Sequence, residues 1–200
     1  MFQSDIVLKS KDYVKKLLAD IDKKHWYFYH NLGHTLNVFE RASYLAYKEW
    51  LDEEMQEIVQ LAAIFHDTWF KKQYDKNEII WTQIAEEFLK ENNFPEDKID
   101  IVKNVILATI PSKEAMSHLE EIIKDADVDN FWRDDFLDKN DRLYEEFKRF
   151  KKLDINQKTW LEKSLKLLQK HKFYTKTQVE ERTEQFEQNK KELKNRLKNM

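Results

Sequence analysis

The sequence predicts an all-helical protein, and residue usage is the first reason. Its 200 residues include only one glycine and two prolines, whereas average usage would give roughly 14 and 10 in a chain of this length. Folds built from β-strands need many tight turns, which these residues favour. The chain also shows no alternation of apolar and polar residues long enough to indicate a strand. Because 41% of the residues are hydrophobic, one packed domain is expected.

Apolar residues at helical spacing predict four helices in the first half of the chain. The first is expected near residues 5–24, and the second carries His34 and ends near Trp50. The third covers 53–69; it begins with acidic residues, which suit the helix dipole, and contains the run LAAIF, which predicts burial on all sides. The fourth runs from residue 77 to residue 92.

Further helices are expected in the second half. Pro95 opens one of them, at a position where proline is favoured. Ser117 and Glu120 form a capping box before the next. Two more are expected near 134–152 and 156–171. The chain is thus predicted to be a single compact helical domain of about eight or nine helices.

The C-terminal segment differs in composition from the rest. Residues 177–200 are almost all polar, with Val179, Phe186, Leu193 and Leu197 at roughly heptad spacing. This pattern predicts a charged helix packed on the domain or on a partner. A frayed, solvated helix explains the same residues. We therefore assign residues 1–176 to the helical domain and treat 177–200 as a separate C-terminal helix.

Composition also excludes several classes of function. The formal net charge is −3, so no overall basic field is present to bind nucleic acid. The absence of cysteine excludes disulfides and thiolate metal sites. No apolar run approaches the roughly 18 residues of a membrane span, and the N-terminus lacks the apolar core of a signal peptide. A cytoplasmic protein without a membrane partner is expected by default.

Three ionisable residues end apolar stretches, where an unpaired charge is costly. His66 and Asp67 follow the run LAAIF, and Asp127 lies in IIKDADVDNF, where three aspartates alternate. Taken singly, such a histidine is more often a core residue, and such an aspartate is more often a helix cap. Together with His34 they indicate a metal site, since helices bring distant residues together and bundle cores are where such sites form.

The ordered series His34, His66-Asp67 and Asp127 resembles the HD superfamily of metal-dependent phosphohydrolases. The surrounding segments YHNLGHTLNV, LAAIFHDTW, NEIIWTQIAEEFL, VILATI and IIKDADVDNF also resemble that family in order and spacing. They are most similar to a small bacterial branch of predicted HD phosphohydrolases. The resemblance covers roughly residues 25–150 and implies a helical HD-type domain.

The resemblance implies that His34, His66, Asp67 and Asp127 bind one divalent metal ion. Two imidazoles and two carboxylates suit Mn²⁺, Fe²⁺, Co²⁺, Ni²⁺, Zn²⁺ or Mg²⁺. Family members with two ions generally carry additional histidines between the HD pair and the last aspartate. This chain has only His118 in that interval, where it begins a helix, so a single ion is expected.

The implied activity is hydrolysis of a small phosphorylated substrate, a nucleotide or related phosphate ester. Water acidified by the metal would attack phosphorus, beside Asp67. Glu78 is a candidate to accept a proton from that water. As an acidic residue in the first turn of a helix, Glu78 also has a purely structural explanation.

Four residues are candidates for substrate binding. His30 precedes His34 by four residues, so on a helix the two would share a face. Lys71 and Lys72 follow the HD pair and could meet phosphate, although lysines at such positions are often only solvated. Thr109 matches a family pattern in which a histidine follows two or three residues later. This chain has PSK there instead, which puts that part of the substrate pocket in doubt.

Two other classes of function remain open at this point. The domain could keep the metal site and sense a nucleotide without turnover, or it could be a helical adaptor whose histidines are structural. Stoichiometric metal would exclude the adaptor, and phosphate release would exclude the sensor. A homodimer is also left open, because the sequence does not give the oligomeric state.

Overall fold

The computed structural model describes residues 2–25, 28–68, 78–150 and 154–200, and it gives only the backbone of 20–25 and 78–79. Within these ranges the protein is all-helical, as predicted, with no strand. The helices are α1 (Asp5–His25), α2 (Leu32–Lys48), α3 (Glu53–Phe65), α4 (Glu78–Glu91), α5 (Glu96–Ala108), α6 (His118–Asp127), the 3₁₀ helix η1 (Asp129–Trp132), α7 (Phe136–Phe150), α8 (Gln157–Lys170) and α9 (Lys176–Lys198). In these ranges no helix combines the length and apolar character needed to cross a bilayer.

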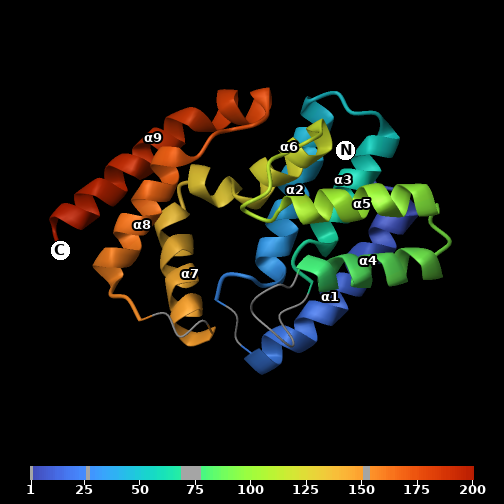
Figure 1. The fold of residues 1–200 in the computed structure, drawn as a ribbon, viewed down its shortest axis with the longest axis horizontal. Helices are drawn as coiled ribbons and strands as arrows, with labels where there is room; N and C mark the ends of the chain where they lie inside the picture. The colour runs from blue at the N-terminus through green and yellow to red at the C-terminus, as the bar shows by residue number, and fades with distance from the viewer. Residues whose placement is uncertain (1, 26–27, 69–77, 151–153) are drawn as a thin grey trace.

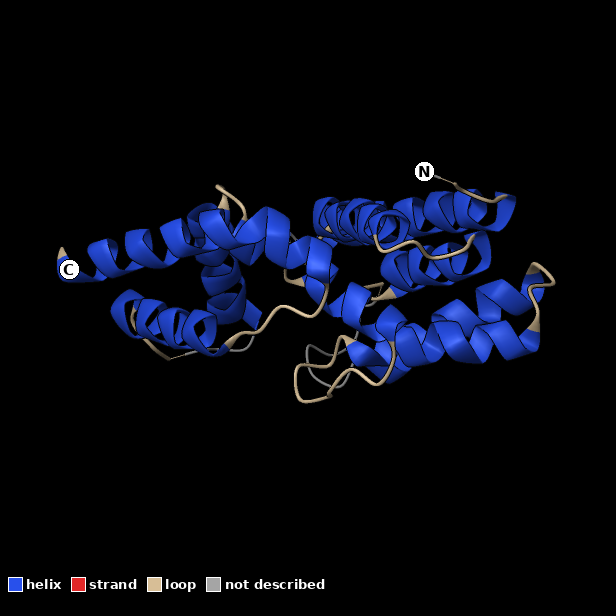
Figure 2. Ribbon diagram, turned by 90° about the horizontal axis from the view of Figure 1, so that it is seen from above, coloured by secondary structure: helices blue, strands red, loops and turns tan. Residues whose placement is uncertain are grey.

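The helices form two groups, each around its own apolar core. Figure 1 shows α1 to α6 on one side and α7 to α9 on the other, with the short helix η1 between them. The view from above shows the same two groups, with the C-terminus at the outer end of the second group and the N-terminus on the first group (Figure 2). One hydrophobic cluster contains residues from Val7 to Ala126, and the other contains residues from Trp132 to Leu193.

Helix α3 is the centre of the first group. All its residues from Ile58 to Phe65 are buried, which confirms the burial predicted from LAAIF. The helix ends at Phe65, earlier than the predicted residue 69. The backbone N–H and the hydroxyl of Thr68 both donate to the carbonyl of Phe65, over 3.3 and 3.0 Å. These bonds turn the chain just after His66 and Asp67, and so place both residues at a helix end.

The second group packs aromatic side chains from η1 and α9. Trp132 is fully buried, with its ring centroid 3.8 Å from that of Phe186 and 4.0 Å from that of Phe173. In α9, Phe186 and Leu193 are buried, whereas Val179 is 44% exposed. The roughly heptad pattern of the C-terminal segment therefore marks a helix that packs on its own chain along most of its length.

We expect Trp132→Ala to lower the free energy of unfolding by about 3–5 kcal/mol, because it leaves a cavity among packed rings. Trp50 is a matched control, since it lies two residues after the end of α2 and its side chain is 93% exposed. Trp50→Ala should change stability by less than about 0.5 kcal/mol. Urea unfolding followed by circular dichroism measures both variants. Equal losses in the two would contradict the packing described here.

His171 should make stability depend on pH. Burial, together with the nearby cation of Lys124, lowers the pKa of His171 from 6.5 to about 4. Between pH 4 and 6.5 the unfolded chain therefore binds the proton more readily than the folded chain, so stability falls as the pH drops through this window. His171→Leu should reduce the stability lost between pH 7 and pH 5 by about 2 kcal/mol. An unchanged loss in urea titrations at the two pH values would refute this.

Candidate metal centre

Four side chains from three parts of the first group converge on one point. They are His34 in the first turn of α2, His66 and Asp67 just after α3, and Asp127 at the last residue of α6. One ligand atom from each lies within 4.8 Å of all the others. His34, His66 and Asp67 are buried, while Asp127 is half-buried. The cluster is therefore reached from the side of Asp127.

Local structure at the start of α2 sets the position of His34. Asn31 is the N-cap, and its side-chain oxygen accepts a hydrogen bond from the backbone N–H of His34 over 3.2 Å. A Cβ atom on Gly33 would lie 3.0 Å from that same oxygen. The single glycine of the chain thus leaves room for the cap that orients the first turn.

The hydrogen bond of His66 determines which of its ring nitrogens faces the cluster. Its Nδ1 lies 2.7 Å from the carbonyl oxygen of Ala63. Because a carbonyl can only accept, Nδ1 carries the proton and the Nε2 lone pair of the neutral ring points to the other ligands. Nε2 of His66 is 3.3 Å from Nε2 of His34. Histidines that bind metal are commonly held in this way, by a backbone carbonyl on the other nitrogen.

The carboxylates of the cluster are strongly held in their charged form. Burial alone would raise the pKa of Asp67, but His66 and His34 hold it well below its ordinary value of 3.8. Burial opposes ionisation of Asp127 too, yet hydrogen bonds from His34 and His66 lower its pKa to about 2. Oδ2 of Asp67 lies 3.1 Å from Nε2 of His34.

The donor set fits a divalent cation. Burial alone would lower the pKa of His66, but Asp67 and Asp127 raise it well above 6.5, so protonated imidazoles can offset the two carboxylates. With the neutral imidazoles that bind metal, the carboxylates leave a charge of about −2 in a largely buried place, which a divalent ion would offset. Oδ2 of Asp67 is buried and faces Nε2 of His34 at 3.1 Å and Nε2 of His66 at 3.3 Å, so these three atoms are close enough to share one ion. Two nitrogen and two oxygen ligands suit several divalent first-row ions and Mg²⁺. These residues could therefore hold one ion.

The alternating aspartates around Asp127 face three different partners. Asp125 accepts from the backbone N–H of Thr175 over 2.7 Å and from its hydroxyl over 2.8 Å, at the N-cap of α9. Asp129 accepts two hydrogen bonds from Arg182 in α9, over 3.0 and 3.1 Å. It also lies 3.2 Å from Nε of Arg41 in α2. Asp127, between them, is the one that reaches the histidines.

The second group of helices also holds the segment that leads into α2. Glu146 of α7 is fully buried and accepts from the backbone N–H of Tyr29 over 2.8 Å and of His30 over 3.1 Å. Its other oxygen lies 2.5 Å from Nδ1 of His30. The spacing of His30 and His34 predicted that the two would share a helix face. This prediction is wrong, because α2 begins at Leu32 and His30 lies before it. The ring centroid of His30 is 5.7 Å from that of His34.

Of the other predicted site residues, only Thr109 has a side chain within the described part of the chain. Lys71 and Lys72 lie outside the described residues. Helix α4 begins at Glu78, whose side chain is also outside them. Thr109 is the C-cap of α5, and its hydroxyl donates to the carbonyl of Ile106 over 2.8 Å. It lines a cavity that Asp127 also lines, so it lies near the cluster.

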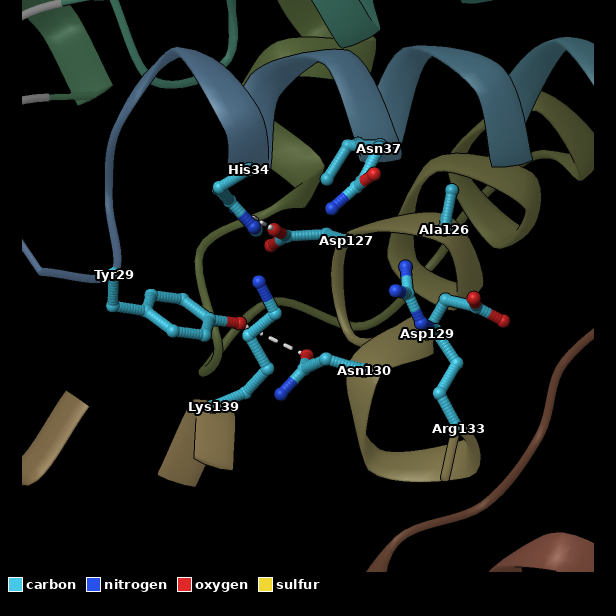
Figure 3. Close-up of a pocket in the computed structure, with 10 residues that line it drawn as sticks. Tyr29, His34, Asn37, Ala126, Asp127, Asp129, Asn130, Arg133 and Lys139 are labelled. Carbon is cyan, nitrogen blue, oxygen red and sulfur yellow. Dashed lines mark hydrogen bonds and ion pairs between the residues drawn. The ribbon is translucent and has the colours of Figure 1, made fainter. Parts of the chain in front are cut away.

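Cationic side chains beside Asp127 were not found from the sequence. Lys139 and Arg133 line a small cavity of about 20 Å³ together with Asn130 and Asp127. Figure 3 shows the amine of Lys139 extending toward the space next to the Asp127 carboxylate. Arg133 donates to Asp135 over 2.9 Å. Both cations belong to the charged stretch RDDFLDKND, which reads as a solvated surface and gives no signal for a site.

Chelation of bound metal should destabilise the protein. An ion that binds only the folded state at a hundred times its Kd adds about 2.7 kcal/mol of stability, which corresponds to roughly 5–10 °C in a chain of this size. Excess EDTA should lower Tm by that amount, and Asp67→Ala should remove the difference. Asp12→Ala, on the exposed face of α1, is the control and should keep it. Identical melting curves of the original protein with and without EDTA would count against the site.

Comparison with known proteins agrees with this geometry. A model of the HD domain family matches residues 31–130, which is half of the chain and includes all four residues of the cluster. No curated protein and no solved structure was found to match the chain. The family match and the His/Asp cluster together show that this chain belongs to the HD-domain superfamily of metal-dependent phosphohydrolases.

Proposed function

We propose that the chain hydrolyses a nucleotide or related phosphate ester at the cluster of His34, His66, Asp67 and Asp127. The observation that carries this proposal is the convergence of four ligand atoms within 4.8 Å. Most of the cluster is buried, and two carboxylates beside neutral imidazoles need a compensating charge there. A site for one divalent ion would supply that charge.

The residues of the chain have separate tasks in this reaction. A divalent ion held by these four residues would supply an acidified water and would neutralise charge on the phosphoryl group. The carbonyl of Ala63 keeps the Nε2 lone pair of His66 aimed at the cluster. Asp127, as the half-buried ligand, lies on the side where substrate enters. Glu78, at the start of α4, is proposed to take the proton from the attacking water.

Cations near Asp127 are proposed to bind the phosphate. Lys139 and Arg133 line the cavity next to Asp127, where positive charge would stabilise the negative charge that builds on the phosphoryl oxygens. His30, held by Glu146, is proposed to orient the substrate on the other side. Lys71, Lys72 and Thr109 stay in the proposal as further substrate contacts.

We expect the protein loaded with Mn²⁺ or a similar ion to release phosphate or pyrophosphate from at least one compound in a broad panel of nucleotides and phosphate esters. Asp67→Asn keeps the shape of the side chain but removes its charge, so kcat should fall at least about a hundredfold. Asp12→Asn is the control and should retain full activity. Phosphate release measured by a colorimetric assay gives both rates.

Glu78→Gln, in the same assay, separates proton transfer from a structural role. A general base at this position predicts a drop in kcat of about 10²–10⁴-fold with metal binding retained. A residue that only favours the helix dipole predicts an unchanged rate and a stability loss of roughly 0.3–1 kcal/mol. A protein that binds metal but turns over nothing in the panel would instead indicate the sensing module.

A further inference from the structure

A large cavity adjoins the metal cluster on the side of the second helical group. Its volume is about 460 Å³, which is within the range of small-molecule sites. Asp127 and His30 line it at the cluster, and residues of α7 and α8 line most of the rest. A neighbouring cavity of about 250 Å³ shares Asp127, Phe131 and Leu167 with it, so the two adjoin. A molecule bound at the cluster therefore has room to extend between the two groups of helices.

The walls of this cavity are mainly aromatic and aliphatic. Phe131, Phe147 and Trp160 contribute rings, and leucines from α7 and α8 contribute much of the remainder. The rings of Phe147 and Trp160 meet edge to face, 5.4 Å apart. The indole N–H of Trp160 donates to the backbone carbonyl of Asn140 over 3.2 Å, so its orientation is fixed. Leu167 is 51% exposed, which leaves apolar surface open at the rim.

The apolar walls begin directly beside the cluster. Val128, the residue after Asp127, lines the cavity, and Phe131 follows one turn later. The group bonded to a phosphate at the cluster would lie against these side chains. A sugar in contact with Val128 and Phe131 would give up water on its hydroxyls against apolar side chains, which is unfavourable. An aromatic group would gain from the burial.

One buried polar group on the cavity lacks a partner. Asn140 is only 4% exposed, and its Nδ2 makes no hydrogen bond within the described part of the chain. The hydroxyl of Ser164 lies 2.8 Å from Oδ1 of Asn140 and 3.0 Å from the carbonyl of Trp160. If the amide were turned around, one of its N–H groups would bond to Ser164 and the other would still lack an acceptor. A ligand atom that accepts a hydrogen bond would satisfy this donor.

We propose that the substrate is a phosphate ester whose alcohol part is an aromatic ring system carrying a hydrogen-bond acceptor, with the ring close to the phosphate and bound in this cavity. This inference rests on the proposed function, and it selects phosphate esters of apolar ring alcohols over nucleotides, in which a polar ribose adjoins the phosphate. The second helical group, outside the matched residues 31–130, would then supply the selectivity.

Two esters of similar intrinsic reactivity test the proposal. 2-Naphthylmethyl phosphate and glycerol 1-phosphate are both primary alkyl esters, so their leaving groups differ little in chemistry. With the metal-loaded protein, kcat/KM should be at least about a hundredfold higher for the naphthylmethyl ester, because its rings are removed from water. Equal values for the two esters would overturn the proposal, as would a nucleoside monophosphate that reacts faster than the naphthylmethyl ester.

A matched pair of variants assigns this preference to the cavity. Leu167→Trp fills the rim and should lower the ratio of the two kcat/KM values at least about tenfold. Leu8 is exposed to a similar extent, 48%, on α1, and Leu8→Trp should leave the ratio unchanged. Both sites are exposed, so both variants are expected to fold, and circular dichroism checks this. An unchanged ratio in Leu167→Trp would overturn the assignment.

A binding measurement separates this inference from the proposed function. 2-Naphthylmethanol has no phosphate, and calorimetry can measure its binding to the protein without turnover. The proposal predicts binding that Leu167→Trp weakens at least about tenfold. Absence of binding would overturn the inference even if phosphate esters are hydrolysed. Binding by a protein that hydrolyses no ester would overturn the proposed function and leave the cavity as a site for aromatic rings.

Discussion

The compensation of three carboxylates, two of them buried and one half-buried, is the constraint on which the rest of this structure depends. Asp125, Asp127 and Asp129 lie within five residues at the junction of α6 and η1. Each would be costly to bury alone. The N-cap of α9 compensates the first, the histidine cluster surrounds the second, and two arginines surround the third. The two helical groups are therefore joined at the place where the metal ligand must be positioned.

This constraint explains why the site forms at a helix end. Asp127 is the last residue of α6, and the chain then tightens into η1. Because the residues two positions before and after it are held by α9, Asp127 has little freedom to turn away from His34 and His66. Glu146 acts similarly on the other side, since it holds the backbone of Tyr29 and His30 just before α2. The ligands are thus preorganised by contacts far from them in sequence, as precise sites require.

Local patterns predicted the helices, because these depend on short-range features, whereas the four residues of the cluster were predicted as a set by the resemblance to the HD superfamily. Apolar spacing located α3, and the costly position of Asp67 after LAAIF marked it as unusual. Three features depended on contacts that spacing does not reveal. The pattern did not show that Thr68 would end α3 early, that His30 would pair with Glu146 across 116 residues, or that Lys139 would line a cavity beside Asp127. The sequence pattern of a charged stretch is the same whether its side chains are solvated or line a site.

Apart from Arg41, the partners of Asp125 and Asp129 lie at residues 174–182, whereas the family pattern ends at residue 130. The stretch that is recognisable as homologous is therefore shorter than the unit that must stay together. A gene fusion or recombination event that kept only the recognisable stretch would separate Asp125 from the N-cap of α9 and Asp129 from Arg182. In the evolution of this chain, the C-terminal helices have to be inherited with the ligands, even though their own residues could diverge wherever these contacts are kept.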